Sequence, residues 1–412
     1  MQNFNNQYNF RVDNQIKLIN LLKNGQQSIN YLAEKLDLSF TAVSKIVEQL
    51  ISYNVLKKVN IKNHTKKRGR LPVLVKINTS VGVTCAIDLS STDLVVSLNT
   101  LTEKVIVSKK IPNVLFVTED ELKKISEVIN ELLKAPEVEK RPLLGICIAS
   151  PGIINKDTEQ LHIAFRLQAL VNTPVTTYFF NKFNAPTHMY NDVKTACIGE
   201  MVYGNIPQNA KNYLFIHVGG SVGAAMVFGG KLYQGKSGYS GEFTNYVEEA
   251  GGSTARNRLL GFWAIEDYVY KHDPSIMIKP HNDSTSNLKV LMEEYKKNNP
   301  VVLDAIDELA KQNAIQFIAY NDFLDLEYIV IEGSIALFKE KYQASLTKYI
   351  NELDMAPFNA KILFSSLEGE ATHVGAIYCA TRNYFLNRLE EITIDRSSTG
   401  NYDISEAFSD SI

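Results

Sequence analysis

The sequence lacks any apolar run near the roughly 18 residues that a membrane-spanning helix needs, so no such helix is predicted. It has only four cysteines, Cys85, Cys147, Cys197 and Cys379, and none forms a Cys-x-x-Cys pair. Three lie inside apolar runs, which indicates buried thiols in a reducing compartment. The first residues are polar and lack the apolar segment of a secretory signal. We therefore expect a cytoplasmic protein.

The charge is unevenly distributed along the 412 residues, a length sufficient for two or three domains. The net charge is −2, from 43 basic and 45 acidic residues. Residues 1–80 carry 13 Lys and Arg against 4 Asp and Glu, a net of +9, so the remainder carries −11. A basic head on an acidic body indicates a polyanionic partner for the head alone. A merely soluble, lysine-rich domain is the alternative.

Residues 1–78 are predicted to form a winged helix-turn-helix domain. Ser28 and Ser39 each precede an apolar pattern of helical period, so each is a candidate N-cap. The break between the two helices is short, as in a helix-turn-helix. Strand-like segments at 55–61 and 73–77 follow and flank a basic tip, which is typical of a wing.

The candidate DNA-binding residues lie on the third helix and on the tip of the wing. Short polar and basic side chains on the outward face of that helix can reach base edges and phosphates; they are Thr41, Ser44, Lys45 and Gln49. The wing contributes Lys66, Lys67, Arg68 and Arg70. Arg-Gly-Arg is narrow enough to enter a minor groove. A solvated basic loop is the alternative for the wing tip.

The body, residues 79–390, shows one pattern twice. Strand, small-residue turn, strand, turn, strand occurs at 81–110 and again at 213–234. Two such halves predict an α/β, two-lobed, actin-like sugar-kinase fold with lobes at about 79–200 and 201–390. In that fold the small-residue turns hold nucleotide phosphates through backbone N–H groups.

Several motifs of the body, in the expected order, resemble those of the ROK family, which contains repressors and sugar kinases. The head, with its Gly-Arg-x-Pro hairpin, is similar to the repressor branch. The matching segments of the body are Ala149–Gly152, Asn191–Glu200, Gly229–Gly235, Gly238–Glu242, Ile329–Ser334 and Val374–Ala376.

The resemblance implies a sugar site near Asn191, Asp192 and Glu242. Asp192 matches the catalytic aspartate of the family's kinases, where a carboxylate accepts a proton from the attacking sugar hydroxyl. In a binding site without catalysis it would accept hydrogen bonds from sugar hydroxyls. The local alternative is an N-cap on the helix that follows.

The phosphate turns depart from the kinase pattern. Asp88 and Thr92 remain, but Ser90 replaces a glycine, and Gly219-Gly220-Ser221 stands where the family has Gly-Thr-Gly. A side chain hinders close approach of the backbone to phosphate. We therefore interpret these residues as a remnant of a nucleotide site, and we do not expect ATP as a cofactor.

The zinc site of the family has no counterpart, because Asn245 stands at its histidine and residues 246–266 contain no Cys or His. Gapless counting places two further ligand positions at Arg166 and Glu266. An arginine in the pocket would favour an anionic ligand such as a sugar phosphate or sugar acid. The alternative is a surface arginine paired with a carboxylate.

The sequence leaves the roles of His217 and Trp263 open and assigns no function to the C-terminal tail. His217 lies in an apolar strand and is expected in the core, while Trp263 either stacks on a sugar or packs a helix. Residues 391–412 are polar and acidic.

The sequence predicts a sugar-responsive transcriptional regulator that forms a homodimer or homotetramer and binds an operator in double-stranded DNA. A sugar kinase that retained a DNA-binding head is one alternative. Constitutive DNA binding with an inert body is another.

Overall fold

The computed structural model describes residues 14–59, 72–91, 93–112, 114, 116–164, 166–242, 259–277, 280 and 284–394. The chain forms two compact units, the first from residues 1–152, 159–190 and 376–412 and the second from 153–158 and 191–375. This division differs from the predicted lobes, because the boundary falls at 190/191 and the C-terminal residues return to the first unit. Over the described residues, no helix is both long and apolar enough to span a membrane.

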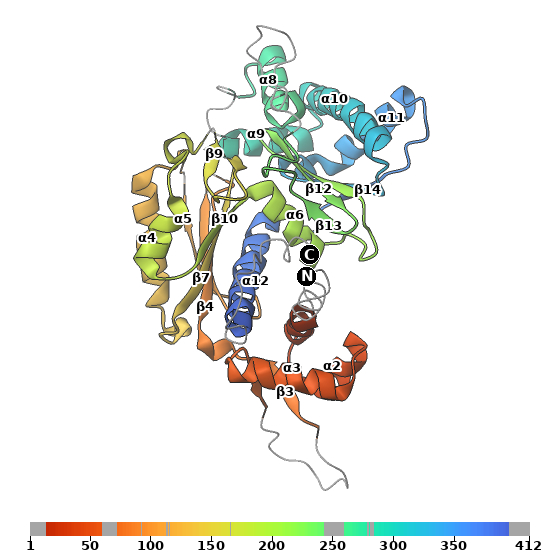
Figure 1. Cartoon of the computed structure of the whole chain (residues 1–412). Coiled ribbons are helices and arrows are strands. Elements are labelled where there is room, and N and C mark those ends of the chain that lie inside the picture. Colours follow the sequence, from red (N-terminus) through yellow and green to blue (C-terminus); the bar gives the residue numbers. More distant parts are fainter. Residues whose placement is uncertain are drawn as a thin grey trace. The chain divides into compact units, whose positions relative to one another are not determined.

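The head contains the predicted helices and wing strands (Figure 1). A helix over residues 14–22 precedes β1 (Gln27–Ser28), α2 (Ile29–Leu36) and α3 (Phe40–Ser52). Both predicted caps are confirmed: the Oγ of Ser28 accepts from the Tyr31 N–H and that of Ser39 from the Ala42 N–H, each at 3.2 Å. The wing strands β2 (Leu56–Lys58) and β3 (Leu74–Ile77) pair antiparallel, in the sheet order β1-β3-β2.

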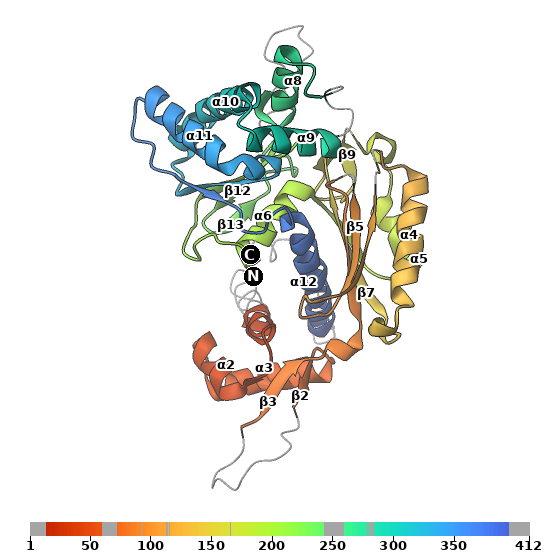
Figure 2. The ribbon, with the colours of Figure 1, turned by 180° about the vertical axis from the view of Figure 1, so that it is seen from behind.

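The first unit also contains a five-stranded sheet of order β10-β7-β4-β5-β6. Its strands, in chain order, are β4 (Val83–Asp88), β5 (Leu94–Asn99), β6 (Val105–Ile111), β7 (Leu143–Ser150) and β10 (Thr187–Asn191). Figures 1 and 2 show α4 (Glu119–Leu133) and α5 (Val175–Phe183) on one face and α12 (Ala371–Ile394) on the other. The short strand β9 (Leu161–Ile163) lies in the same unit.

The second unit repeats that topology in a sheet of order β13-β12-β11-β14-β15. The strands are β11 (Tyr213–Val218), β12 (Val222–Phe228), β13 (Lys231–Tyr233), β14 (Tyr328–Glu332) and β15 (Lys361–Phe364), and β8 (Ile153–Ile154) belongs to the same unit. In each sheet the first strand pairs antiparallel with the second and parallel with the fourth. The duplication predicted from the two sequence patterns is therefore confirmed.

Helices cover both faces of the second sheet. One face packs α6 (Asp192–Tyr203). The other packs a larger apolar core with α8 (Trp263–His272), α9 (Ser284–Lys296), α10 (Pro300–Leu324) and α11 (Lys339–Leu353). The α6 helix also approaches the start of α12 closely, since a Cβ on Gly375 would overlap the Thr195 carbonyl oxygen. The helix that begins at Asp192 is thus held between a sheet and the first turn of α12.

The pair of helices α10 and α11 is joined by one carboxylate. Asp307 accepts hydrogen bonds from the Lys341 ammonium at 2.9 Å, the Ser345 hydroxyl at 2.6 Å and the Tyr349 hydroxyl at 2.5 Å. Partial burial alone would raise the pKa of Asp307, but these three hydrogen bonds outweigh it and lower the pKa to about 2. The ionised carboxylate therefore stabilises the folded chain.

Replacing Asp307 by Asn is expected to lower the free energy of unfolding at neutral pH by about 1 kcal/mol, a value that includes screening by water. Because the folded pKa is depressed, the contribution is present above about pH 4 and is lost as the pH falls toward about 2. Urea unfolding at about pH 6 and about pH 3 measures it. The exposed Asp304 on the same helix gives the control Asp304→Asn, and an equal deficit of Asp307→Asn at both pH values would contradict the account.

Candidate functional site

The helix α3, the predicted recognition helix, presents only part of the predicted set to solvent. Thr41 and Lys45 are exposed and Ser44 is half-buried. Gln49 is buried, with 8% of its surface exposed, so its predicted place on the outward face is wrong. A buried side chain at this position is not available to read a base edge. The candidate base-reading surface is therefore the N-terminal half of α3.

An exposed aromatic residue lies at the start of this surface and was missed in the sequence. Phe40 is the first residue of α3 and is 54% exposed. Residues at the N-terminus of a recognition helix contact base edges, and an aromatic ring can contact a thymine methyl. Helical periodicity does not reveal this exposure, because Phe40 precedes the buried Val43 by three residues and so falls on the face that the pattern assigns to the core. The four predicted wing residues Lys66, Lys67, Arg68 and Arg70 lie outside the described residues.

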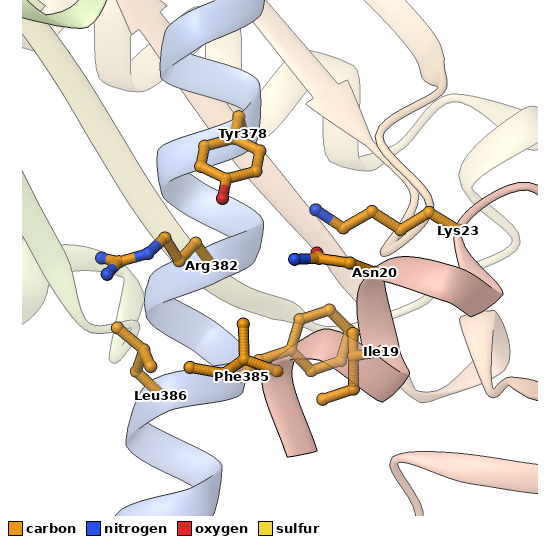
Figure 3. A pocket seen from close by; sticks show the side chains of 8 residues that line it. Ile19, Asn20, Lys23, Tyr378, Arg382, Phe385 and Leu386 are labelled. Atoms are coloured by element: carbon orange, nitrogen blue, oxygen red, sulfur yellow. The ribbon is translucent and has the colours of Figure 1, made fainter. Parts of the chain in front are cut away.

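The head packs against the C-terminal helix. Phe385, Leu386 and Leu389 of α12 share one buried apolar cluster with the helices of the head. Figure 3 shows the neighbouring pocket, where Ile19 approaches Phe385 from the head side. The head is therefore not an independent domain on a flexible linker, since its core continues into α12.

An ion pair also joins the head to the body. The Lys23 ammonium lies 2.5 Å from a carboxylate oxygen of Glu103, in the turn between β5 and β6, and both side chains are mostly buried. It also lies 4.4 Å from the centroid of the Tyr378 ring. Burial lowers the pKa of Lys23, and Glu103 opposes this shift. Polar contacts thus fix the end of the first head helix to a hairpin of the body.

The first phosphate turn is occupied by the protein's own hydrogen bonds. The Leu89 N–H donates to the Ala149 carbonyl at 2.9 Å, and the Ser90 N–H donates to the Asp88 carboxylate at 2.8 Å. Backbone N–H groups that serve internal acceptors do not form an open anion cradle. Thr92, the other retained residue of the turn, lies outside the described residues.

Arg166 fixes this turn from the carbonyl side. Its guanidinium donates to the carbonyls of residues 89, 90 and 91 and of Val114, at 2.8–3.4 Å. These carbonyls account for the position of the guanidinium without an anionic ligand. The predicted ligand role of Arg166 therefore loses its motivation, and with it the argument for a sugar phosphate or sugar acid.

Replacing Arg166 by Met is expected to cost about 3 kcal/mol of unfolding free energy, because several carbonyls lose a charged donor. Arg166→Lys should recover only part of the loss, since an ammonium cannot span the same fork of acceptors. Thermal melting of the purified variants measures the effect. Unchanged melting together with weakened binding of an anionic sugar would restore the ligand role.

The second turn is filled by side chains of its own unit. A Cβ on Gly220 would lie 2.8 Å from the Trp263 indole, and one on Gly219 would overlap the His217 imidazole. The N–H of Gly219 donates to the Ser221 carbonyl at 3.1 Å, and the Trp263 N–H donates to the Gly220 carbonyl at 3.2 Å. The two glycines thus accommodate protein rings. The residues of this turn do not fit a nucleotide phosphate.

The structure tests the expectation for His217, while sugar stacking by Trp263 stays a prediction. The expectation of a core histidine is wrong, because the His217 side chain is 35% exposed and its Nδ1 hydrogen-bonds the Glu332 carboxylate. The two residues are directly paired on the parallel strands β11 and β14. Trp263 is half-buried against Gly220, which accounts for its packing.

The start of α6 holds the candidate ligand carboxylate in place. Asn191 is the N-cap, since its side-chain oxygen accepts from the Lys194 N–H at 3.0 Å. The alternative role of Asp192 as N-cap is therefore wrong. One oxygen of Asp192 accepts from the Val193 N–H at 2.8 Å and from the Asn191 amide at 3.1 Å. These bonds fix the orientation of a half-buried carboxylate.

The second candidate carboxylate, Glu242, follows a loop shaped by glycines. Gly238 and Gly241 have φ of +88° and +89°, which other residues rarely adopt. A Cβ on Gly238 would lie 2.6 Å from the Ile154 carbonyl, and one on Gly241 would overlap the carbonyl of Ala224 in β12. A Cβ on Gly223, the residue before Ala224 in β12, would lie 2.8 Å from the side chain of Val193 in α6. Adjacent residues of one strand thus position the segments that carry Asp192 and Glu242.

Glu266 is placed differently from these two. It is fully buried in the first turn of α8, and its N–H donates to the Phe262 carbonyl at 3.4 Å. Its ligand role stays a prediction. Within the part of the chain that the structure describes, no group of three His, Cys, Asp or Glu could hold a metal ion. Asn245 and most of residues 246–266 lie outside that part.

Fold and site together define a sugar-kinase-like protein with a winged helix-turn-helix head. The sequence model of the ROK family matches residues 84–255 of this chain. The xylose repressor of Caldicellulosiruptor bescii is 25% identical over 384 residues, covering 89% of this chain and 94% of that protein. The DNA-binding transcriptional dual regulator NagC of Escherichia coli K12 is 20% identical over 211 residues, covering 51% of each chain.

Solved structures share the fold. A ROK family transcriptional regulator, described as a homologue of the E. coli MLC protein, superposes with a TM-score of 0.73 at 18% identity and covers 94% of this chain and 100% of its own. A ROK family glucokinase from Streptomyces griseus, solved with glucose and AMPPNP, gives 0.58 at 17% identity and covers 73% and 100%. The regulator therefore matches a larger share of this chain than the glucokinase does, 94% against 73%.

Proposed function

We propose that this chain is a sugar-responsive, DNA-binding transcriptional repressor of carbohydrate genes. The observation that carries the proposal is the winged helix-turn-helix head, whose core continues into α12 of the kinase-like body. The similarity to a xylose repressor along nearly its whole length supports the same role. The head binds an operator in double-stranded DNA, with Thr41 and Lys45 of α3 and the wing arginines as candidate contacts.

The ligand is a small sugar held by Asp192, Asn191 and Glu242. Carboxylate and amide oxygens accept hydrogen bonds from sugar hydroxyls. A sugar that binds one arrangement of the body more tightly than another shifts the population between them, and the contact of the head with α12 carries that shift to the DNA-binding surface. The protein acts in the cytoplasm as a homodimer or homotetramer.

A kinase that retained its head is the competing function, and the retained Asp88 and Asp192 favour it. In such an enzyme Asp192 would accept the proton of the attacking hydroxyl. The two phosphate turns oppose it, because their N–H groups and glycines already serve internal contacts. A coupled ATPase assay over a sugar panel separates the two, and turnover abolished by Asp192→Asn would establish the kinase.

An electrophoretic mobility shift with DNA from upstream of the chain's own gene tests the proposal. We expect sequence-preferring retardation whose strength falls steeply with salt, as phosphate contacts require. Thermal shifts over a panel of sugars test ligand binding independently. Absence of salt-sensitive, sequence-preferring retardation would overturn the DNA-binding function.

A further inference from the structure

A lysine occupies an unusual place beside the candidate ligand carboxylates. Lys194 lies in the first turn of α6, two residues after Asp192, and only 7% of its surface is exposed. Cations are unfavourable at the positive end of a helix, and buried lysines are rare unless they are paired. Both costs imply that other groups hold the ammonium there.

Two groups of one loop hold it. The Lys194 ammonium donates a hydrogen bond to the carbonyl of Gly238. Burial lowers the pKa of Lys194, and the charge of Glu242 opposes that shift, so this carboxylate lies close enough to attract the ammonium. Lys194 therefore connects the first turn of α6 to the Gly238 end of the segment 238–242, and the negative charge of Glu242 favours the ammonium there.

Close packing at two glycines restricts the backbone of the segment 238–242. Gly238 is buried and faces the carbonyl of Ile154, and Gly241 lies against β12. Within the segment, the hydrogen bond from the Glu242 N–H to the Tyr239 carbonyl is long, at 3.4 Å. The hydrogen bond from Lys194 to the Gly238 carbonyl adds a charged contact between this loop, which carries Glu242, and the helix that begins at Asp192.

We propose that Lys194 is a positioning residue for the ligand site: its ammonium fixes the loop 238–242 to the start of α6 and so sets the separation of the Asp192 and Glu242 carboxylates. The inference rests on the proposed sugar site. Carboxylate oxygens at this separation would accept hydrogen bonds from the hydroxyls of a neutral polyol. Without the ammonium, the Gly238 end of the loop loses its hydrogen bond to α6.

Lys194→Met in the full chain tests the proposal, because methionine keeps much of the volume and removes the charge. The matched control is Lys236→Met, at an exposed lysine of the neighbouring loop. Hydrogen exchange without sugar should show the amides of residues 237–242 exchanging at least about tenfold faster in Lys194→Met and within about twofold of wild type in the control. Titration with D-xylose should show about tenfold to hundredfold weaker binding for Lys194→Met alone.

Lys194→Arg separates positioning from packing, since it restores a cationic donor. We expect it to recover most of the loop protection, which a purely steric role would not require. Unchanged exchange of residues 237–242 in Lys194→Met would overturn the inference. If Lys194→Met does not fold, Glu242→Gln provides the exchange test, because it removes the attraction and leaves the lysine. Failure of wild type to bind any sugar of a panel would instead count against the proposed function, while exchange without sugar still tests the contact.

Discussion

Replacing Asp192 by Asn is expected to weaken sugar binding about 10- to 100-fold while leaving operator affinity without sugar unchanged within about twofold. A charged acceptor that binds sugar hydroxyls contributes about 1.5–3 kcal/mol, which corresponds to this range of affinity. Asparagine keeps an oxygen able to accept from the Val193 N–H, so the start of α6 should remain folded. Isothermal titration with sugar and anisotropy with operator DNA measure the two quantities separately.

Asp120→Asn is a matched control for this substitution. Asp120 also lies in the first turn of a helix, α4, but its side chain is 78% exposed and pairs with the neighbouring Lys123. Sugar affinity of this variant should equal that of wild type. Equal sugar affinity in Asp192→Asn as well would remove Asp192 from the ligand site.

Replacing Phe385 by Ala is expected to cost about 3–5 kcal/mol of unfolding free energy and to weaken operator binding at least tenfold. The ring is 3% exposed in the cluster that joins α12 to the head, so its loss leaves a cavity at that contact. A head that docks less tightly populates more orientations and binds DNA more weakly. Hydrogen exchange of residues 14–22 and operator titration measure the two consequences.

Phe179→Ala provides the comparison, since Phe179 is 1% exposed in α5 and lies outside the cluster of the head. It should cost similar stability but leave exchange of residues 14–22 close to that of wild type. If both variants weaken operator binding equally, general destabilisation explains the loss and the contact between the head and α12 has no special role.

The fold could be predicted because its signals are local. Ser28 and Ser39 cap helices by contacts three residues along the chain, and the strand patterns carry their own turns. Gln49 was misplaced because it lies at the border between the two faces of α3, where the helical pattern alone does not separate buried from exposed positions.

The site could be predicted only in outline, because its decisive contacts join distant residues. Arg166 meets carbonyls 75 to 77 positions earlier, and Lys194 meets a carbonyl 44 positions later. The closure of the second phosphate turn depends on Trp263, from a separate helix. The sequence motifs located Asp192 and Glu242, whereas the lysine between them is visible only when α6 and the loop 238–242 are seen together.

Titration of sugar into the complex of this chain with its upstream DNA, followed by fluorescence anisotropy without ATP, tests the central claim most directly. The account predicts that one sugar of the panel raises the Kd for DNA at least about tenfold, a coupling of roughly 1.4 kcal/mol or more. It also predicts that the sugar is recovered unphosphorylated when ATP is present. A Kd that no sugar changes, or a sugar recovered as its phosphate, would contradict the account.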